Sequence, residues 1–240
     1  MGNDSDHSVW DWSRRRQLAR FPNGNPKRAT ITSLQIINQD VGGMLLSSSG
    51  NTSSLAASVM SLTLCLADGM IRLYRNYDPA TSSTDVQMVS AFRGLSEIIS
   101  MRRGAGVIMD WKQAGGFLLV GGDSRIIRVW DAHTEAQLLV CASPVIESRS
   151  RNIPQDLETN SDSPVTAIAS ERGPSSVLLA SFADGVIKVF DRRLEEEDAV
   201  VRSFNEHTNW VQNVGWQPHF GNQFLSARSV SYRNCYPDDV

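Results

Sequence analysis

One strand type recurs along this chain of 240 residues, and each copy follows a chain-reversing aspartate and ends in an aromatic residue. The full copies are DGMIRLY from Asp68, DSRIIRVWD from Asp123 and DGVIKVFD from Asp184. A fourth copy of the aromatic end, SVWDW at residues 8–12, has no turn before it. An Asp-Gly turn that feeds a strand closing on Trp-Asp is typical of one blade of a β-propeller.

The three aspartates are predicted to be equivalent hairpin corners in successive blades. Asp followed by Gly tolerates the positive φ of a tight turn, and the carboxylate can accept hydrogen bonds that tie neighbouring loops together. In the propeller family that this pattern resembles, a histidine at the start of a blade often donates to such an aspartate. His207 stands at that blade-start position, but its aspartate partner would lie beyond residue 225, where the sequence has no turn aspartate followed by a strand.

The aromatic residues at the strand ends are predicted to pack in the core between blades. They are Trp10, Tyr74, Trp130 and Phe190. Among the other tryptophans, Trp12 and Trp216 are the two expected to reach the surface, where tryptophan is a favoured contact residue.

Alternating apolar residues predict the strands of each blade. The first blade is assigned 30–37, 44–48, 70–74 and 86–92; the second 106–111, 116–120, 126–130 and, as its outer strand, 137–141; the third 165–170, 177–181, 186–190 and 199–204. A fourth blade begins at 206–218 and is not completed. The predicted fold class is therefore all-β, a partial WD-repeat β-propeller of about three blades plus half of a fourth.

The domain prediction divides the chain into a disordered start at 1–7, the partial propeller at 8–227 and an aberrant or disordered tail at 228–240. The strand-end aromatics are 64, 56 and 60 residues apart, whereas a blade of this kind takes about 40–45 residues. Residues 50–66 and 138–155 are therefore interpreted as insertions. The hypothesis is that these two segments and the tail are translated intervening sequence; the alternative is ordinary surface loops.

Composition narrows the function classes. The formal net charge of −3 offers no general attraction to phosphate backbones, so nucleic acid is not an expected partner. Three widely spaced cysteines without a Cys-x-x-Cys pair argue for a reducing compartment and against a zinc site. The longest apolar stretch, 55–67, is shorter than the roughly 20 residues that span a bilayer. The chain is expected to be cytoplasmic, without membrane insertion, cofactor or small-molecule substrate.

Motifs that carry catalysis are not found in the sequence. There is no Gly-x-Ser-x-Gly elbow, phosphate-binding loop, His-Glu-x-x-His or dinucleotide fingerprint. The run His133-Thr134-Glu135 matches half of a deaminase signature, but the paired cysteines of that zinc shell are missing. The chain is therefore predicted not to be an enzyme; a propeller-based hydrolase is kept as the less favoured alternative.

Several runs in order resemble the C-terminal WD-repeat propeller of the Raptor family, above all its fungal members. They include SVWDW at 8–12, VSAFRGLSEI at 89–98, GGDSRIIRVWD at 121–131 and DGVIKVFDRR at 184–193. The resemblance implies a non-enzymatic scaffold of the TOR kinase complex 1 that acts in nutrient-responsive growth signalling. It also implies the TOR kinase and other complex 1 proteins as partners, with recruitment to the vacuolar or lysosomal surface. An unrelated WD-repeat adaptor in ubiquitin ligation or trafficking is the alternative.

Overall fold

The computed structural model describes residues 6–24, 30–37, 44–50, 69–77, 85–95, 97–99, 104–131, 155–173, 175–218 and 222–229. All regular elements in these residues are β-strands. They are β1 (Asp6–Asp11), β2 (Arg16–Pro22), β3 (Thr30–Ile37), β4 (Met44–Gly50), β5 (Met70–Arg75), β6 (Gln87–Arg93), β7 (Val107–Lys112), β8 (Phe117–Gly122), β9 (Ile126–Asp131), β10 (Gln155–Glu158), β11 (Val165–Ser170), β12 (Val177–Phe182), β13 (Ile187–Asp191), β14 (Val200–Phe204), β15 (Val211–Trp216) and β16 (Phe224–Arg228).

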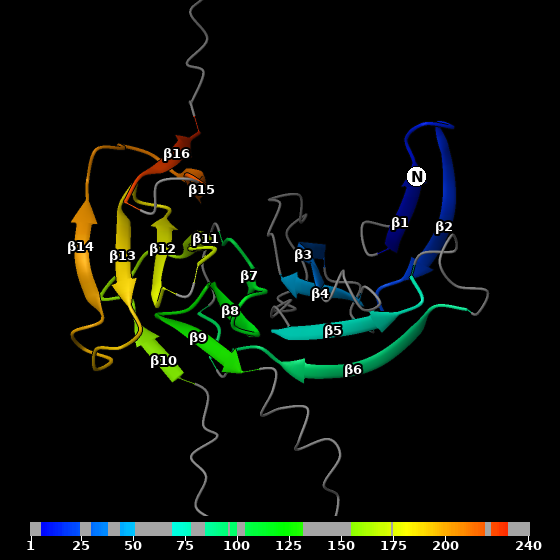
Figure 1. The fold of residues 1–240 in the computed structure, drawn as a ribbon, viewed down its shortest axis with the longest axis horizontal. Helices are drawn as coiled ribbons and strands as arrows, with labels where there is room; N and C mark the ends of the chain where they lie inside the picture. Colours follow the sequence, from blue (N-terminus) through cyan, green and yellow to red (C-terminus); the bar gives the residue numbers. More distant parts are fainter. Residues whose placement is uncertain are drawn as a thin grey trace, which may run out of the picture.

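The strands form three antiparallel four-stranded sheets, each in chain order: β3–β6, β7–β10 and β11–β14. We call these blades 1, 2 and 3. A first hairpin, β1–β2, precedes them and a last hairpin, β15–β16, follows them. The first strands of successive units pack side by side in the order β3, β7, β11, β15. The blades therefore fan out along an arc, with the first hairpin at one end and the last hairpin at the other (Figure 1).

The middle strands are apolar on both faces because each lies between two neighbouring blades. In β12, Leu178 packs with residues of blade 2 and Leu179 packs with the last hairpin. Both side chains are essentially buried. An outer strand such as β14, in contrast, is largely exposed along its length. Continuous apolar runs in inner strands and polar outer strands follow from this stacking.

In the described residues, four apolar cores lie between successive units. One core joins the first hairpin to blade 1 around Phe21 and Tyr74, and a second joins blade 1 to blade 2 around Ile71 and Val120. The third joins blades 2 and 3, and the fourth joins blade 3 to the last hairpin. The prediction of an all-β partial propeller, with three blades and half of a fourth, is confirmed.

The predicted outer strand of blade 2, residues 137–141, lies outside the described residues, and the outer position is taken by β10 instead. This strand pairs with β9, so that Leu157 lies opposite Ile127. Leu157 is fully buried in the core shared with blade 3. On the other face the Arg128 guanidinium makes an ion pair with the Asp156 carboxylate at 2.5 Å. The assignment of 137–141 to this position was therefore wrong.

The start of the chain also differs from the prediction. Strand β1 begins at Asp6, inside the segment expected to be disordered, and it has its own antiparallel partner, β2. Of the segments interpreted as insertions, residues 51–66 and 138–154 lie outside the described residues, whereas Gly50 and Gln155 belong to strands. Of the tail, Arg228 ends β16, and residues 230–240 are not described.

Candidate interaction surface

The corner of blade 2 is held by Asp123. Its carboxylate accepts hydrogen bonds from the backbone N–H groups of Ala105 at 2.6 Å and Gly106 at 3.0 Å, in the loop that leads into β7. The side chain is buried, and burial raises the pKa of the carboxyl although the two donors oppose the rise. Asp123 thus ties a hairpin corner to a neighbouring loop, as the sequence predicted.

Asp184 is not the equivalent of Asp123. It is exposed, and its Oδ1 accepts a hydrogen bond only within its own turn, from the N–H of Val186 at 3.0 Å. In blade 2 the hydrogen bond within the turn is made by Ser124, whose Oγ accepts from the N–H of Ile126 at 3.3 Å. The two corner aspartates are therefore offset by one residue. Asp68 lies outside the described residues.

His207 finds a partner other than the aspartate expected from the repeat pattern. Its Nε2 lies 2.7 Å from the Oγ of Ser226 on β16. The pair joins the loop after β14 to the second strand of the last hairpin. The turn of blade 3 packs against the same loop, because a Cβ at Gly185 would meet the His207 carbonyl oxygen at 2.3 Å.

The strand-end aromatics face the unit that precedes them. Phe190 and Tyr74 are buried, and the Tyr74 hydroxyl donates to the Asn23 carbonyl at 2.5 Å. Trp130 is half-buried; its Nε1 donates to the Gly94 carbonyl at 3.1 Å, and its ring meets Phe92 edge-on. Trp10 is 64% exposed, so its assignment to the core between blades was wrong for this chain. No unit precedes β1 in the described residues.

The two tryptophans expected at the surface differ. Trp12 is 90% exposed, as predicted. Trp216 is half-buried instead, because its Nε1 donates to the Ala169 carbonyl of blade 3 at 3.0 Å and its ring packs in the last core. Trp12 is followed by three arginines, so an exposed aromatic side chain and positive charge are combined at this turn.

Threonine side chains form hydrogen bonds between neighbouring units, a feature that the sequence did not predict. The Thr32 hydroxyl of blade 1 donates to the Val107 carbonyl of blade 2 at 2.8 Å. At the matching place in blade 3, the Thr166 hydroxyl donates to the Val211 carbonyl. The signal was a polar residue at the same position of two otherwise apolar inner strands.

A second link between blades involves Asp110 on β7. Its Oδ2 accepts a hydrogen bond from the N–H of Ser170 on β11 at 2.7 Å. The pKa of the carboxyl is raised by burial, which outweighs the hydrogen bonds from Ser170. The hydrogen bond from Ser170 to the Asp110 carboxylate links the inner strands β11 and β7.

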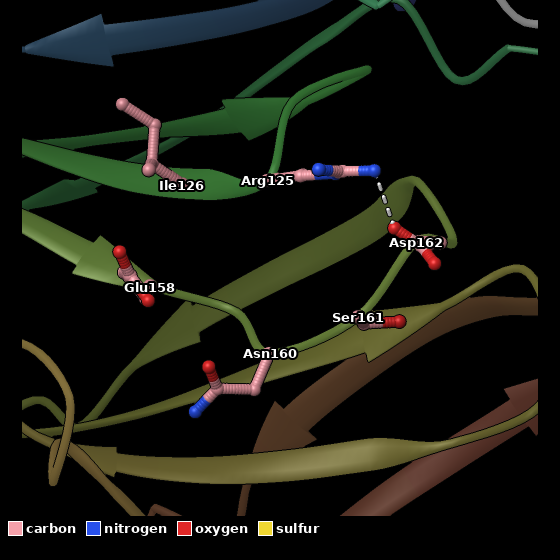
Figure 2. A pocket seen from close by; sticks show the side chains of 6 residues that line it. All are labelled: Arg125, Ile126, Glu158, Asn160, Ser161 and Asp162. Atoms are coloured by element: carbon pink, nitrogen blue, oxygen red, sulfur yellow. Dashed lines mark ion pairs between the residues drawn. The ribbon is translucent and has the colours of Figure 1, made fainter.

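A polar hollow of about 410 Å³ lies where the β9 corner meets the loop after β10. Figure 2 shows Arg125 and Asp162 pointing toward each other at its rim, 2.7 Å apart, with Glu158, Asn160 and Ser161 around it. Beneath this loop, Lys188 donates to the carbonyls of Thr159 and Asn160, and burial lowers the pKa of the lysine. The hollow offers carboxylate and amide contacts for a peptide, and its one hydroxyl, on Ser161, accepts a hydrogen bond from the N–H of Ser163 at 3.2 Å.

Within the described part of the chain, no three His, Cys, Asp or Glu side chains are grouped as a metal site requires. The same residues include no helix of the length and apolarity needed to cross a bilayer.

Four-stranded sheets that pack through their first strands, with strands closing on an aromatic residue and aspartate, define a WD-type β-propeller, of which this chain forms an arc. The chain is 30% identical over 214 residues to the target of rapamycin complex 1 subunit KOG1 of Saccharomyces cerevisiae. It is also 30% identical over 229 residues to the target of rapamycin complex 1 subunit mip1 of Schizosaccharomyces pombe. The resemblance to the Raptor family is thereby confirmed.

The crystal structure of Chaetomium thermophilum Raptor has the same arrangement, with a TM-score of 0.67 and 31% identity over 93% of this chain. The alignments with KOG1 and mip1 cover 88% and 95% of this chain. They cover only 11% and 15% of those two relatives, and the chain spans only 17% of the Raptor chain. No protein-family model matches the sequence. The similarity therefore concerns one segment of much longer proteins.

Proposed function

We propose that this chain is a non-catalytic interaction platform of TOR complex 1. The observation that carries the proposal is the similarity to complex 1 subunits of two yeasts and to a Raptor structure across about nine tenths of the chain. Identity of 30% that extends through all three blades, with a matching fold, is more specific than any single blade motif. The partners proposed are the TOR kinase and other proteins of the complex.

The chemistry of the described residues supports a platform rather than an enzyme. His7 is buried between the rings of Phe21 and Tyr74, where burial lowers its pKa. His207 contacts Ser226 as part of a link between a loop and a strand. The half-buried carboxylate of Asp110 and the buried carboxylate of Asp123 accept hydrogen bonds from backbone N–H groups. Each of these groups has a structural task.

The exposed groups suit protein contacts. Trp10 and Trp12 place two indole rings in solvent at the first hairpin, and tryptophan is enriched among residues that dominate binding energy. An unrelated WD-repeat adaptor would use the same kind of surface, so partner identity decides between the two functions. We also propose a cytoplasmic location with recruitment to the vacuolar or lysosomal surface through the complex.

The test is affinity purification of the tagged full chain from its host, followed by mass spectrometry. We expect the TOR kinase among the recovered proteins. A Gly122→Ala variant, which cannot keep the blade 2 corner, should lose it, whereas Gly215→Ala, whose Cβ meets no atom within 4 Å, should retain it. Recovery of ubiquitin-ligase or coat proteins without the kinase would refute the proposal.

A further inference from the structure

The polar hollow between the β9 corner and the loop after β10 has walls whose backbone is fixed by hydrogen bonds. The N–H and the hydroxyl of Thr159 both donate to the Arg125 carbonyl at 2.8 Å, so the loop and the corner are joined directly. The Lys188 ammonium donates to two carbonyls of the same loop, at 2.7 and 2.8 Å. The shape of the hollow is therefore formed before a ligand enters, as is usual for binding sites.

Strand β10 presents two carboxylates on one face of blade 2, and the fold provides a partner for only one of them. Asp156 and Glu158 are two residues apart in the strand, so their side chains lie on the same face. Asp156 lies opposite Arg128, whose Nε and Nη2 donate to its two carboxylate oxygens at 2.6 and 2.5 Å. Glu158 lies opposite Ile126 instead. In the described part of the chain, the exposed Glu158 carboxylate makes neither a hydrogen bond nor an ion pair.

The other charged groups that line the hollow are already paired with each other. The Arg125 guanidinium contacts the Asp162 carboxylate at 2.7 Å, and both side chains are mostly exposed. Figure 2 shows Glu158 on β10, apart from this pair at the rim. An acidic ligand would have to displace Asp162 from Arg125 and would be repelled by Glu158. A cation, in contrast, finds a carboxylate without a competing partner.

We propose that this hollow binds an arginine side chain of a partner protein, which pairs with Glu158 as Arg128 pairs with Asp156. The inference deepens the proposed platform function and rests on it, since it names the chemistry of one contact that the platform makes. The carboxamide of Asn160 also lines the hollow, and its oxygen can accept a further guanidinium hydrogen bond. The side chain of Ile126 offers an apolar surface for the aliphatic stem of the arginine.

Arginine fits the hollow better than an acidic or a neutral side chain. Its planar guanidinium has five donors and binds a carboxylate through two parallel hydrogen bonds, and lysine lacks this geometry. The volume of about 410 Å³ lies within the range of about 300–1,000 Å³ that is usual for ligand sites. The hydroxyl of Ser161 is taken by the N–H of Ser163, so the carboxylate and amide groups determine the selectivity.

The experiment titrates the purified full chain with the blocked tripeptide acetyl-Ala-Arg-Ala-amide and follows the backbone amide signals of residues 158–162 by NMR. We expect a saturable shift of these signals. The same peptide with citrulline in place of arginine keeps the shape and loses the charge. It should bind at least tenfold more weakly, because the charge-assisted hydrogen bonds are lost.

Glu158→Gln should weaken binding of the arginine peptide at least fivefold. Glu196→Gln is the matched control, since Glu196 is exposed in the turn after β13 and its replacement changes the net charge equally. Both side chains are exposed, so amide signals outside the hollow should keep their positions and show that the fold is intact. Equal effects of the two substitutions would overturn the proposal, because general electrostatic attraction would then explain the binding.

Arg125→Gln tests the sign of the ligand's charge. The substitution removes a positive charge and frees the Asp162 carboxylate, so the arginine peptide should bind at least twofold more tightly. Weaker binding, an equal affinity for the citrulline peptide, or no saturable shift would each overturn the proposal. The titration needs no kinase, so its failure leaves the affinity-purification test of the platform unaffected, and a platform without the kinase leaves the titration unaffected.

Discussion

The Thr166 hydroxyl donates to the Val211 carbonyl, so a side chain of blade 3 satisfies a backbone group of the next unit. The Ser181 hydroxyl lies 3.0 Å from the same threonine oxygen. Thr32, Ser48 and Val107 repeat this arrangement between blades 1 and 2. Blade 2 has Ile108 and Gly121 at the matching positions, where a Cβ on Gly121 would come within 2.9 Å of Ile168. Hydrogen bonding and apolar contact are therefore alternative ways to join neighbouring blades.

Thr166→Val should lower the free energy of unfolding by about 1–3 kcal/mol, because the buried Val211 carbonyl loses a donor that water cannot replace. The change keeps the side-chain volume, so packing loss is small. Urea denaturation monitored by tryptophan fluorescence measures the effect. Ser203→Ala on the exposed strand β14 is the matched control, with an expected change within about 0.5 kcal/mol. Equal effects of the two substitutions would contradict this role of Thr166.

Gly122→Ala should prevent blade 2 from keeping its corner. Gly122 has a φ of 128°, and a Cβ there would lie 1.9 Å from the Gly106 carbonyl oxygen. Because the obstacle is backbone, it cannot turn aside, and the loss should exceed about 3 kcal/mol. The measurement is the urea midpoint or, when no transition remains, the far-ultraviolet circular dichroism spectrum.

Gly215→Ala provides the comparison for this substitution. Its added Cβ meets no atom within 4 Å. The variant should be as stable as the unmodified chain or slightly more so, since alanine restricts the unfolded state. A Gly122→Ala variant with the same midpoint as Gly215→Ala would show that the corner tolerates a side chain.

The strands could be predicted because their pattern is local. Each inner strand is a mainly apolar run of six to eight residues, and β3 and β11 have the bounds expected from the sequence. The offset between Asp123 and Asp184 also has a local signal, the distance from each aspartate to the strand-end aromatic. Six residues separate Asp184 from Phe190, and seven separate Asp123 from Trp130. Ser124 precedes Trp130 by six positions, as Asp184 precedes Phe190, so Ser124 is the equivalent of Asp184.

The outer strand of blade 2 could not be found in this way, because its place depends on distant contacts. Residues 132–154 separate β9 from β10, so no short turn links the two strands. Strand β10 takes the outer position because Leu157 is buried in the core shared with blade 3 and because Asp156 forms an ion pair with Arg128. The exposure of Trp10 depends likewise on which unit precedes it, and a local motif carries no information about that.

Asp123 should make the free energy of unfolding fall as the pH rises above its ordinary pKa of 3.8. Burial raises the pKa of the folded carboxyl, so the folded state holds the proton to a higher pH than the unfolded state. The stabilisation from this group is therefore complete below 3.8 and is lost as the pH passes through the raised pKa. Asp123→Asn removes the titration.

The measurement compares urea denaturation of Asp123→Asn and the unmodified chain in steps from pH 3.5 to neutral. Asp110 has a pKa shifted in the same direction and is present in both proteins, so the difference between the two isolates Asp123. The stability advantage of the unmodified chain should shrink as the pH rises. An advantage that grows with pH would mean that the N–H donors of Ala105 and Gly106 outweigh burial.

Asp191 should behave in the opposite way. Hydrogen bonds from the side chain and the backbone N–H of Arg193 lower the pKa of its carboxyl from 3.8 to about 2. Its stabilisation is therefore present above 3.8 and is lost as the pH falls toward 2. The Arg193 side chain is 73% exposed, so solvent screens the pair and its contribution to stability is small. Carbon-13 NMR titration of the carboxyl gives the pKa directly, and Arg193→Gln should move it back toward the ordinary value. An unchanged pKa in that variant would assign the shift to the backbone donor alone.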